Sequence, residues 1–185
     1  TYTLGGVALA NKNFSENDKT GFAMTVMPAY ADFGVNMKIG ENEVCNTTQI
    51  DAPVESRWHQ IAYVVDRNGS AVTYVDNKAV SAYNIAASEG SIDAENAHLI
   101  FGADGLGQYG MISGEFDDIK IYPFALATGK LEEMYYETML NKVNYEAETM
   151  LASDNAKYYS EENKTALNTL LTASKEYAGN YTLGA

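Results

Sequence analysis

Short runs of alternating apolar and polar residues fill the first two thirds of the chain, a pattern that predicts β-strands. The clearest two runs, residues 58–66 and 70–76, are rich in β-branched and aromatic residues and flank Asn68-Gly69. Because Asn-Gly tolerates the positive φ angles of a type I′ turn, we expect these runs to form an antiparallel hairpin. Asp76-Asn77 predicts a second tight turn, leading into a run over residues 78–83.

Further strands are predicted at residues 21–27, 33–39, 98–101 and 112–122. Turn signals recur about every 8–12 residues, which favours a β-sandwich over alternating strands and helices. In the last run, alternation places Phe116, Asp118 and Tyr122 on one face and Glu115 and Asp117 on the other. Neither face is purely apolar, so acids facing a core would need specific partners.

After Pro123 the apolar period changes to that of helices. The residues that recur every four positions predict one helix with a stripe along one side: Leu131, Tyr135, Met139, Val143, Ala147 and Leu151. Ser160 followed by two glutamates predicts the N-cap of a second helix, and Gly179 predicts its end. The sequence therefore predicts an all-β antiparallel sandwich over residues 1–127 and an α-helical hairpin over residues 128–185.

Composition and charge narrow the classes of function. Apolar residues make up 46% of the chain and charged residues 20%, as in folded globular domains. Twelve Lys and Arg stand against 25 Asp and Glu, giving a net charge of −13, which disfavours nucleic acid and membrane surfaces as partners. No run approaches the roughly 20 apolar residues that span a bilayer. The acidic, tyrosine-rich composition with a single cysteine is typical of a secreted bacterial protein.

Three sequence motifs, in this order, carry a family resemblance. Trp58-His59 opens a strand, Tyr74-Val-Asp-Asn-Lys78 spans a hairpin turn, and Gly114–Tyr122 runs into Ala125-Leu126. These motifs resemble the landmarks of laminin-G-like modules and cover roughly residues 7–134. The resemblance implies a concanavalin A-like jelly roll of the lectin and glucanase type.

The chain departs from that family pattern in two places. Asn77 stands where the family usually has glycine, which is tolerable because asparagine also visits left-handed conformations. Only five residues precede the strand-like segment 6–13, where the family usually has one or more earlier strands. We therefore expect that the module lacks its first strand or strands, or that another segment takes their place.

Residues 144–179 resemble FIVAR repeats, the small helical repeats of surface proteins in Gram-positive bacteria. Tyr158-Tyr-Ser-Glu-Glu162 and the apolar spacing over residues 166–173 carry this second resemblance. It implies a large multidomain protein that is secreted or attached to the bacterial cell surface, so other domains of the same parent chain are expected partners.

Glu115 and Asp117 form the pattern in the sequence that most resembles a catalytic motif. Jelly-roll glycoside hydrolases of the laminarinase type carry a Glu-x-Asp motif followed by a second glutamate on the same strand, and Glu115 with Asp117 is similar to its beginning. Ile119 and Lys120 occupy the places where the second glutamate should stand, so the motif lacks an acid to protonate the leaving group. We expect no catalytic residues and no enzymatic activity.

Calcium is the one cofactor for which the sequence offers candidates, because modules of this superfamily sometimes hold it with carboxylates and loop carbonyls. Calcium takes six to eight oxygen ligands. No loop with the fixed spacing of an EF-hand is present, and metal binding stays open with these candidate donors: Asp93, Glu95, Asp104, Asp117 and Asp118.

Sugar binding is the favoured function. Sugar rings offer a C–H face to aromatic side chains and a rim of hydroxyls to amides and carboxylates. The glycine-rich segment 102–110 carries Asp104, Gln108 and Tyr109, and a second candidate loop carries Tyr30 and Asp32. We expect a non-catalytic carbohydrate-binding or adhesion module that acts outside the cell or on its surface on a glycan or another surface ligand. The alternative is a structural spacer that supports an enzyme domain elsewhere in the parent chain.

Overall fold

The computed structural model describes residues 6–11, 20–27, 32–49, 58–94, 98–105, 107 and 115–180. The chain divides into two compact units, residues 1–126 and 127–185. Among the described residues, the β-strands lie in the first unit and the helices in the second. The strands of the first unit and the helices of the second agree with the predicted sandwich followed by a helical hairpin. The chain as a whole is mixed, so the class all-β describes the first unit only.

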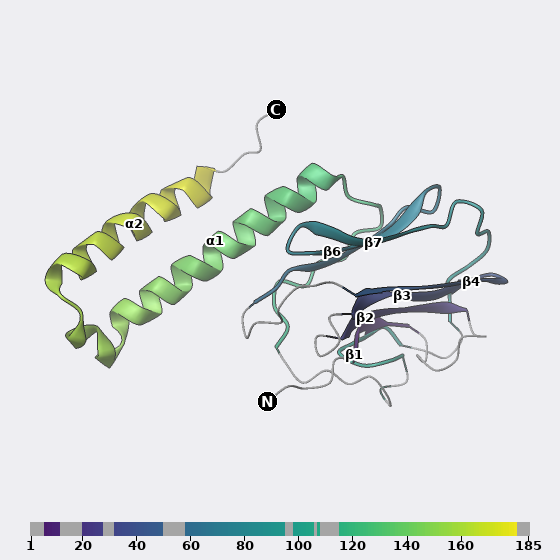
Figure 1. Cartoon of the computed structure of the whole chain (residues 1–185), viewed down its shortest axis with the longest axis horizontal. Helices are drawn as coiled ribbons and strands as arrows, with labels where there is room; N and C mark the ends of the chain where they lie inside the picture. Colours follow the sequence, from purple (N-terminus) through teal and green to yellow (C-terminus); the bar gives the residue numbers. More distant parts are fainter. Residues whose placement is uncertain are drawn as a thin grey trace. The chain divides into compact units, whose positions relative to one another are not determined.

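Two antiparallel sheets build the first unit (Figure 1). The five-stranded sheet has the order β4-β3-β2-β1-β8, with strands at Gly6–Ala10 (β1), Gly21–Met27 (β2), Asp32–Ile39 (β3), Asn42–Gln49 (β4) and Ile100–Phe101 (β8). The three-stranded sheet has the order β5-β6-β7, with strands at Ile61–Val65 (β5), Ser70–Val75 (β6) and Lys78–Asn84 (β7).

The apolar core lies between the two sheets. Along β6 every second residue is buried, as expected for a strand with one face against a core. Met37 and Ile39 of β3 pack with Ala71 of β6 and with Ile85, which follows β7. The hydroxyl of Tyr63 on β5 also reaches across and donates to the carbonyl of Thr25 on β2 at 2.9 Å. Both apolar packing and a polar bridge therefore hold the sheets together.

Most predicted strands are confirmed. Of the two predicted hairpin turns, one is wrong and one is confirmed. β5 and β6 pair antiparallel, as the sequence predicts. The predicted type I′ turn at Asn68-Gly69 is wrong, because neither residue has a positive φ. Hydrogen bonds to Asp66 hold this turn instead. The carboxylate of Asp66 accepts from the N–H of Asn68 at 3.0 Å, and the backbone carbonyl of Asp66 accepts from the N–H of Gly69 at 3.0 Å.

The tight turn predicted at the next hairpin is confirmed. Asp76 and Asn77 have φ angles of 48° and 61°, and Val75 pairs with Lys78 on either side of them. Two successive positive φ angles define the type I′ turn that suits the twist of a hairpin. Asparagine therefore fills the position where the resembling family has glycine.

The strand predicted at residues 112–122 is wrong over its described part. Residues 115–122 form no strand, all of them are exposed, and Asp118 has a φ of 51°, which no strand residue adopts. The mixed pattern gives the reason. With acids alternating onto both faces, neither face can enter a core without burying carboxylates.

Two loops of the first unit meet through glycines. Gly40, in the turn between β3 and β4, has a φ of 56°, and its N–H donates to the carbonyl of Ser91 at 3.1 Å. A Cβ at Gly40 would lie 2.6 Å from the carbonyl oxygen of Glu89. Only glycine fits this close approach, which ties the segment after β7 to the β3–β4 turn.

The second unit consists of α1 (Thr128–Ala152), the short 3-10 helix η2 (Asp154–Tyr158) and α2 (Glu161–Asn180). The predicted helical hairpin is confirmed, but the predicted single stripe is not. Leu131 is buried while Val143 is well exposed. An α-helix has 3.6 residues per turn, so each step of four advances by about 40° and residues at that interval wind around the helix. None of the described helices is long and apolar enough to cross a bilayer.

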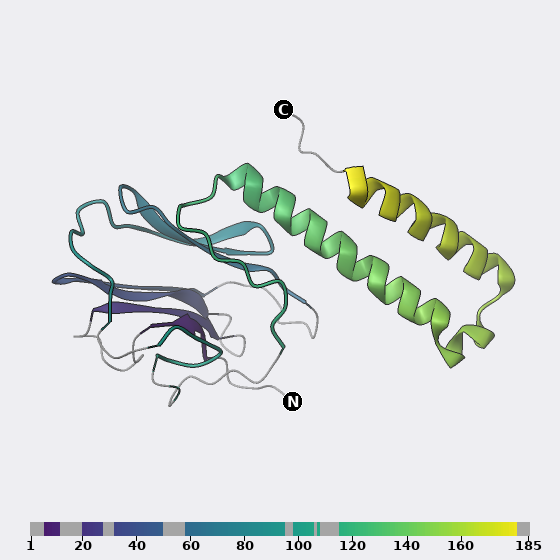
Figure 2. The same ribbon diagram turned by 180° about the vertical axis from the view of Figure 1, so that it is seen from behind.

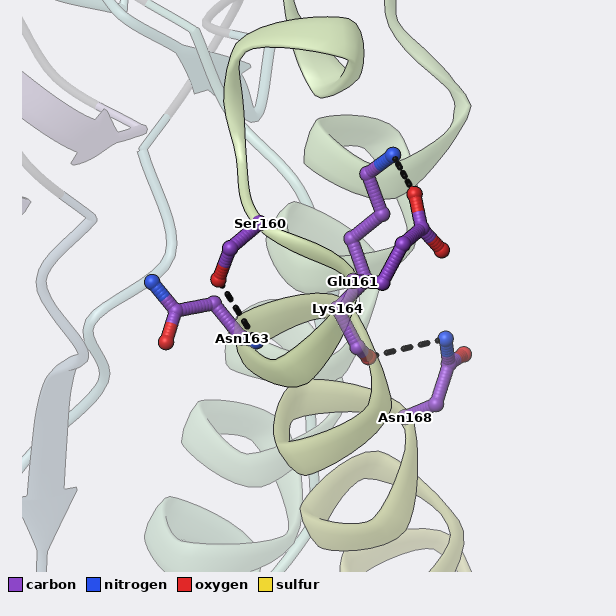
Figure 3. Close-up of polar contacts among 5 residues, drawn as sticks. All are labelled: Ser160, Glu161, Asn163, Lys164 and Asn168. Atoms are coloured by element: carbon purple, nitrogen blue, oxygen red, sulfur yellow. Dashed lines mark hydrogen bonds and ion pairs between the residues drawn. The ribbon is translucent and has the colours of Figure 1, made fainter.

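Ser160 caps the start of α2, as predicted (Figure 3). Its hydroxyl accepts from the N–H of Asn163 at 3.2 Å, and Lys164 pairs with Glu161 at 2.7 Å in the first turn. The predicted end at Gly179 is one residue early, because α2 runs through Asn180. The cap and the first-turn acids together fix where this helix begins.

A small polar cluster joins the two helices, which lie side by side in both views (Figures 1 and 2). Ser174 of α2 donates to the side-chain oxygen of Asn144 of α1 at 2.6 Å, and Asn144 is buried. Leu171 is buried, and Lys175 forms an ion pair with Glu148 across the hairpin. This cluster sets the register of the hairpin.

Candidate functional site

The topology brings the described parts of the two predicted sugar-binding segments to one end of the five-stranded sheet. β8 pairs with β1, and the N–H of Gly102 then donates to the carbonyl of Ala8 at 2.9 Å, so the chain leaves β8 toward the start of β1. At that end Gly6 pairs with Val26 near the end of β2, and Val26 pairs with Phe33 at the start of β3. Asp32 and the segment after Phe101 therefore share one end of the sheet.

The segment after β8 is a tight, glycine-dependent turn. Gly102 and Gly107 have φ angles of 79° and 67°, and the N–H of Gly107 donates to the carbonyl of Asp104 at 2.8 Å. Ala103 and Asp104 are both buried. A carboxylate this deep needs polar or charged groups around it, because a buried unpaired charge is costly. Asp104 is therefore held beneath the surface of the turn.

Phe116 covers this turn from a distant part of the sequence. Its ring atom Cε2 lies 3.2 Å from the point that a Cβ of Gly102 would occupy, so the ring lies against the glycine backbone. The Phe116 side chain is nevertheless 45% exposed, and Phe101 at the end of β8 is exposed as well. Exposed aromatic rings beside a polar turn suit the C–H face of a sugar.

Sequence reasoning missed Phe116 because it placed this residue in a strand. The signal that could have found it is Gly102, since a glycine followed by small residues leaves room for an aromatic ring to approach the backbone. Of the other sugar-binding candidates, Asp32 is the first residue of β3. Tyr30, Gln108 and Tyr109 lie outside the described residues.

The acids considered for catalysis do not lie on a strand. Glu115, Asp117 and Asp118 are exposed, and the carboxylate of Asp117 accepts from the N–H of Asp118 at 2.9 Å. The strand alternation that would aim Glu115 and Asp117 into a cleft is absent over residues 115–122. Over the described residues, Glu115 and Asp117 therefore do not share one face of a strand.

The candidate calcium ligands are dispersed. Asp93 is exposed and accepts from the hydroxyl of Ser91 at 2.7 Å, Asp104 is buried, and Glu95 lies outside the described residues. Within the described part of the chain, no three His, Cys, Asp or Glu residues gather closely enough to hold a metal ion. Calcium binding, which the sequence left open, therefore has no site among the described residues.

His59 and Asp76 form a polar pair at the β6–β7 turn of the first unit. Nδ1 of His59 lies 2.8 Å from Oδ2 of Asp76, and the other carboxylate oxygen accepts from the N–H of Gln60 at 3.1 Å. The backbone N–H of Asp76 donates in turn to the carbonyl of Gln60 at 2.9 Å. These bonds fasten the β6–β7 turn to the chain entering β5, which is a structural role.

Two facing antiparallel sheets, with polar turns and exposed aromatic rings at one end, define a lectin-like β-sandwich. The model of the Concanavalin A-like lectin/glucanases superfamily, in its laminin-G form, matches residues 5–130. The chain belongs to this family, as the sequence motifs predict. The match ends before most of the helical unit, so the FIVAR resemblance of residues 144–179 stays a prediction.

Similarity to individual proteins is slight. No curated protein matches the chain. A crystal structure of an S-layer domain-containing protein from Clostridium thermocellum ATCC 27405, covering its residues 221–444, has a TM-score of 0.34 and 14% sequence identity. That match covers 73% of this chain, and the chain spans 65% of the length of that structure.

Proposed function

We propose that the first unit is a non-catalytic carbohydrate-binding or adhesion module of a secreted or surface-attached multidomain bacterial protein. The proposed binding surface lies at the end of the five-stranded sheet around the turn 102–107. The exposed Phe116 ring against Gly102 is the observation that carries the proposal. A ring fixed over a backbone turn offers a sugar a flat apolar surface with little loss of side-chain entropy.

The shared end of the sheet supports the same surface. Asp32 opens β3 there, two positions after Tyr30 in the sequence, and Gln108 and Tyr109 follow Gly107 in the sequence. Such residues would contribute amide, carboxylate and phenol groups for the hydroxyls of a sugar. The membership in a lectin and glucanase family favours a glycan over another surface ligand.

A glycan array tests the proposal. We expect the full chain to bind a defined group of plant, host or bacterial glycans. Phe116→Ala and Tyr109→Ala should each weaken that binding about tenfold or more, as expected when about 1.4 kcal/mol of stacking is lost. Tyr145→Ala, which removes an exposed tyrosine of α1, is the matched control and should bind like the unaltered chain.

If the folded chain binds no glycan on the array, the binding role is refuted and the structural spacer is favoured. The non-catalytic part of the proposal needs its own measurement. Incubation with β-glucans should release no sugar, and Glu115→Gln should change nothing. Turnover that disappears in Glu115→Gln would instead make the module a glycosidase.

A further inference from the structure

The helical unit carries a row of exposed apolar side chains that its own hairpin does not cover. Tyr136, Val143 and Met150 follow one another at intervals of seven residues along α1, and Leu170 and Tyr177 do so along α2. Side chains seven positions apart lie on the same side of a helix. All five are between 44% and 68% exposed. We call these five residues the apolar face.

An open groove runs along the apolar face. It has a volume of about 380 Å³, and its lining consists of Tyr136, Met139, Leu140, Val143 and Tyr177. The contacts between the two helices use a neighbouring side, because Asn144, one position after Val143, bonds to Ser174. The groove is therefore bounded by both helices and filled by neither.

The charges along the apolar face are acidic. Glu132 lies four positions before Tyr136, and Glu146 lies three positions after Val143, so both lie on the same side of α1 as the face. No lysine of the two described helices lies three, four or seven positions from a residue of the face. A second copy would bring these acids together and would join two chains with a net charge of −13 each.

We propose that the apolar face binds an amphipathic α-helix of a partner protein that carries lysine or arginine on both flanks of its apolar stripe. The fourteen residue steps from Tyr136 to Met150 rise about 21 Å, which accommodates about four turns of such a helix. The partner helix would place apolar side chains at intervals of three and four residues into the groove. Its basic flanks would pair with Glu132 and Glu146.

Binding of synthetic peptides to the full chain tests this proposal. The probe is an 18-residue helical peptide with leucine at intervals of three and four residues and lysine on the flanks, paired with the same peptide carrying glutamate on the flanks. We expect saturable binding of the lysine peptide and binding of the glutamate peptide at least about tenfold weaker. Added salt should weaken the first interaction, because it screens the flanking charges.

A matched pair of variants locates the site. Val143→Lys and Tyr145→Lys add the same charge at positions that are 59% and 66% exposed, so neither disturbs a core. Two positions apart, they lie on nearly opposite sides of α1. Val143→Lys should weaken binding of the lysine peptide about tenfold or more, whereas Tyr145→Lys should leave it within about twofold.

Three results would overturn the proposal. The lysine peptide could fail to bind the unaltered chain, or Tyr145→Lys could weaken binding as much as Val143→Lys does. Alternatively, sedimentation could find a dimer that Val143→Lys dissociates, which would make a second copy the occupant of the face. Because these readouts concern residues of α1, they do not depend on whether the first unit binds a glycan.

Discussion

At the scale of single residues, Gly40 has little room for a side chain. Gly40→Ala would place a Cβ 2.6 Å from the carbonyl oxygen of Glu89 and force a left-handed conformation at a φ of 56°. The left-handed conformation alone costs about 1–2 kcal/mol for a residue with a Cβ, and the backbone contact cannot be relieved by rotating a side chain. We expect a loss of at least about 2 kcal/mol in unfolding free energy, measured by urea denaturation.

Gly69→Ala is the matched control for this prediction. Its Cβ would lie 2.9 Å from the carboxylate oxygen of Asp66, the far end of a side chain that can move, and its φ is not positive. We expect a smaller loss than at Gly40, about 1 kcal/mol or less. Equal losses of unfolding free energy in the two variants would show that the contact of Gly40 with Glu89 is not what makes Gly40→Ala destabilising.

Residue-level features differ in how well the sequence predicts them. The turn at Asp76-Asn77 could be predicted because side chains of these types tolerate positive φ. The turn at Asn68-Gly69 was predicted with the wrong geometry, because the carboxylate of Asp66 offers a competing local hydrogen bond. The contact of Phe116 with Gly102 joins residues far apart in the sequence, so no local pattern encodes it.

At the scale of elements, a buried polar contact between α1 and α2 contributes to the stability of the hairpin. Ser174→Ala would remove the donor to the side-chain oxygen of the buried Asn144, and an unsatisfied buried acceptor costs about 1–3 kcal/mol. We expect the helical signal in circular dichroism to be lost at lower urea concentration. Removing both partners in Asn144→Ala with Ser174→Ala should recover part of the loss.

Thr172→Ala provides the comparison within the same helix. The hydroxyl of Thr172 donates to the carbonyl of Asn168 at 2.8 Å on an exposed side of α2. Removing it leaves no buried group unsatisfied and gives alanine its better helix propensity, so stability should be unchanged or slightly higher. A loss as large as that of Ser174→Ala would mean that hydroxyls of α2 matter for reasons other than the contact with Asn144.

The bridge between the two sheets predicts a dependence on alkaline pH. Part of the Tyr63 side chain is accessible, but its hydroxyl end is enclosed, and this burial raises the pKa of Tyr63 well above its ordinary value of about 10. Below pH 10 the phenol is neutral in both the folded and unfolded states. Above pH 10 the unfolded chain releases the proton and the folded chain does not, so stability falls as pH rises.

Tyr63→Phe isolates this effect. At pH 7 the variant loses the hydrogen bond to Thr25 and should be less stable by about 1 kcal/mol. Above pH 10 the unaltered chain should lose up to about 1.4 kcal/mol more per pH unit than the variant does, so their stabilities should converge. Denaturant titrations at pH 7, 9, 10 and 11 measure the two curves. Parallel curves over this range would contradict an enclosed Tyr63 hydroxyl.

At the scale of the whole molecule, the sequence predicts the class better than the site. Apolar runs such as residues 21–27 and 33–39 fix which segments form strands, because each must bury one face. Segment 115–122 shows the limit of this reasoning, since alternation predicted a strand where acids on both faces oppose burial. The burial of Asp104 likewise depends on how distant segments pack around it.

The net charge of −13 predicts how the whole chain behaves with pH. This charge opposes association between copies at pH 7, although apolar side chains such as Val143, Leu170 and Tyr177 are exposed on the apolar face. Near pH 4.4, the isoelectric point, this repulsion disappears and the exposed apolar residues are free to associate. We expect light scattering to show self-association near pH 4.4 and monomers at pH 7. Val143→Lys should reduce that association more than Tyr145→Lys does, because only Val143 belongs to the apolar face. Equal effects of the two substitutions would instead attribute the association to the general loss of net charge.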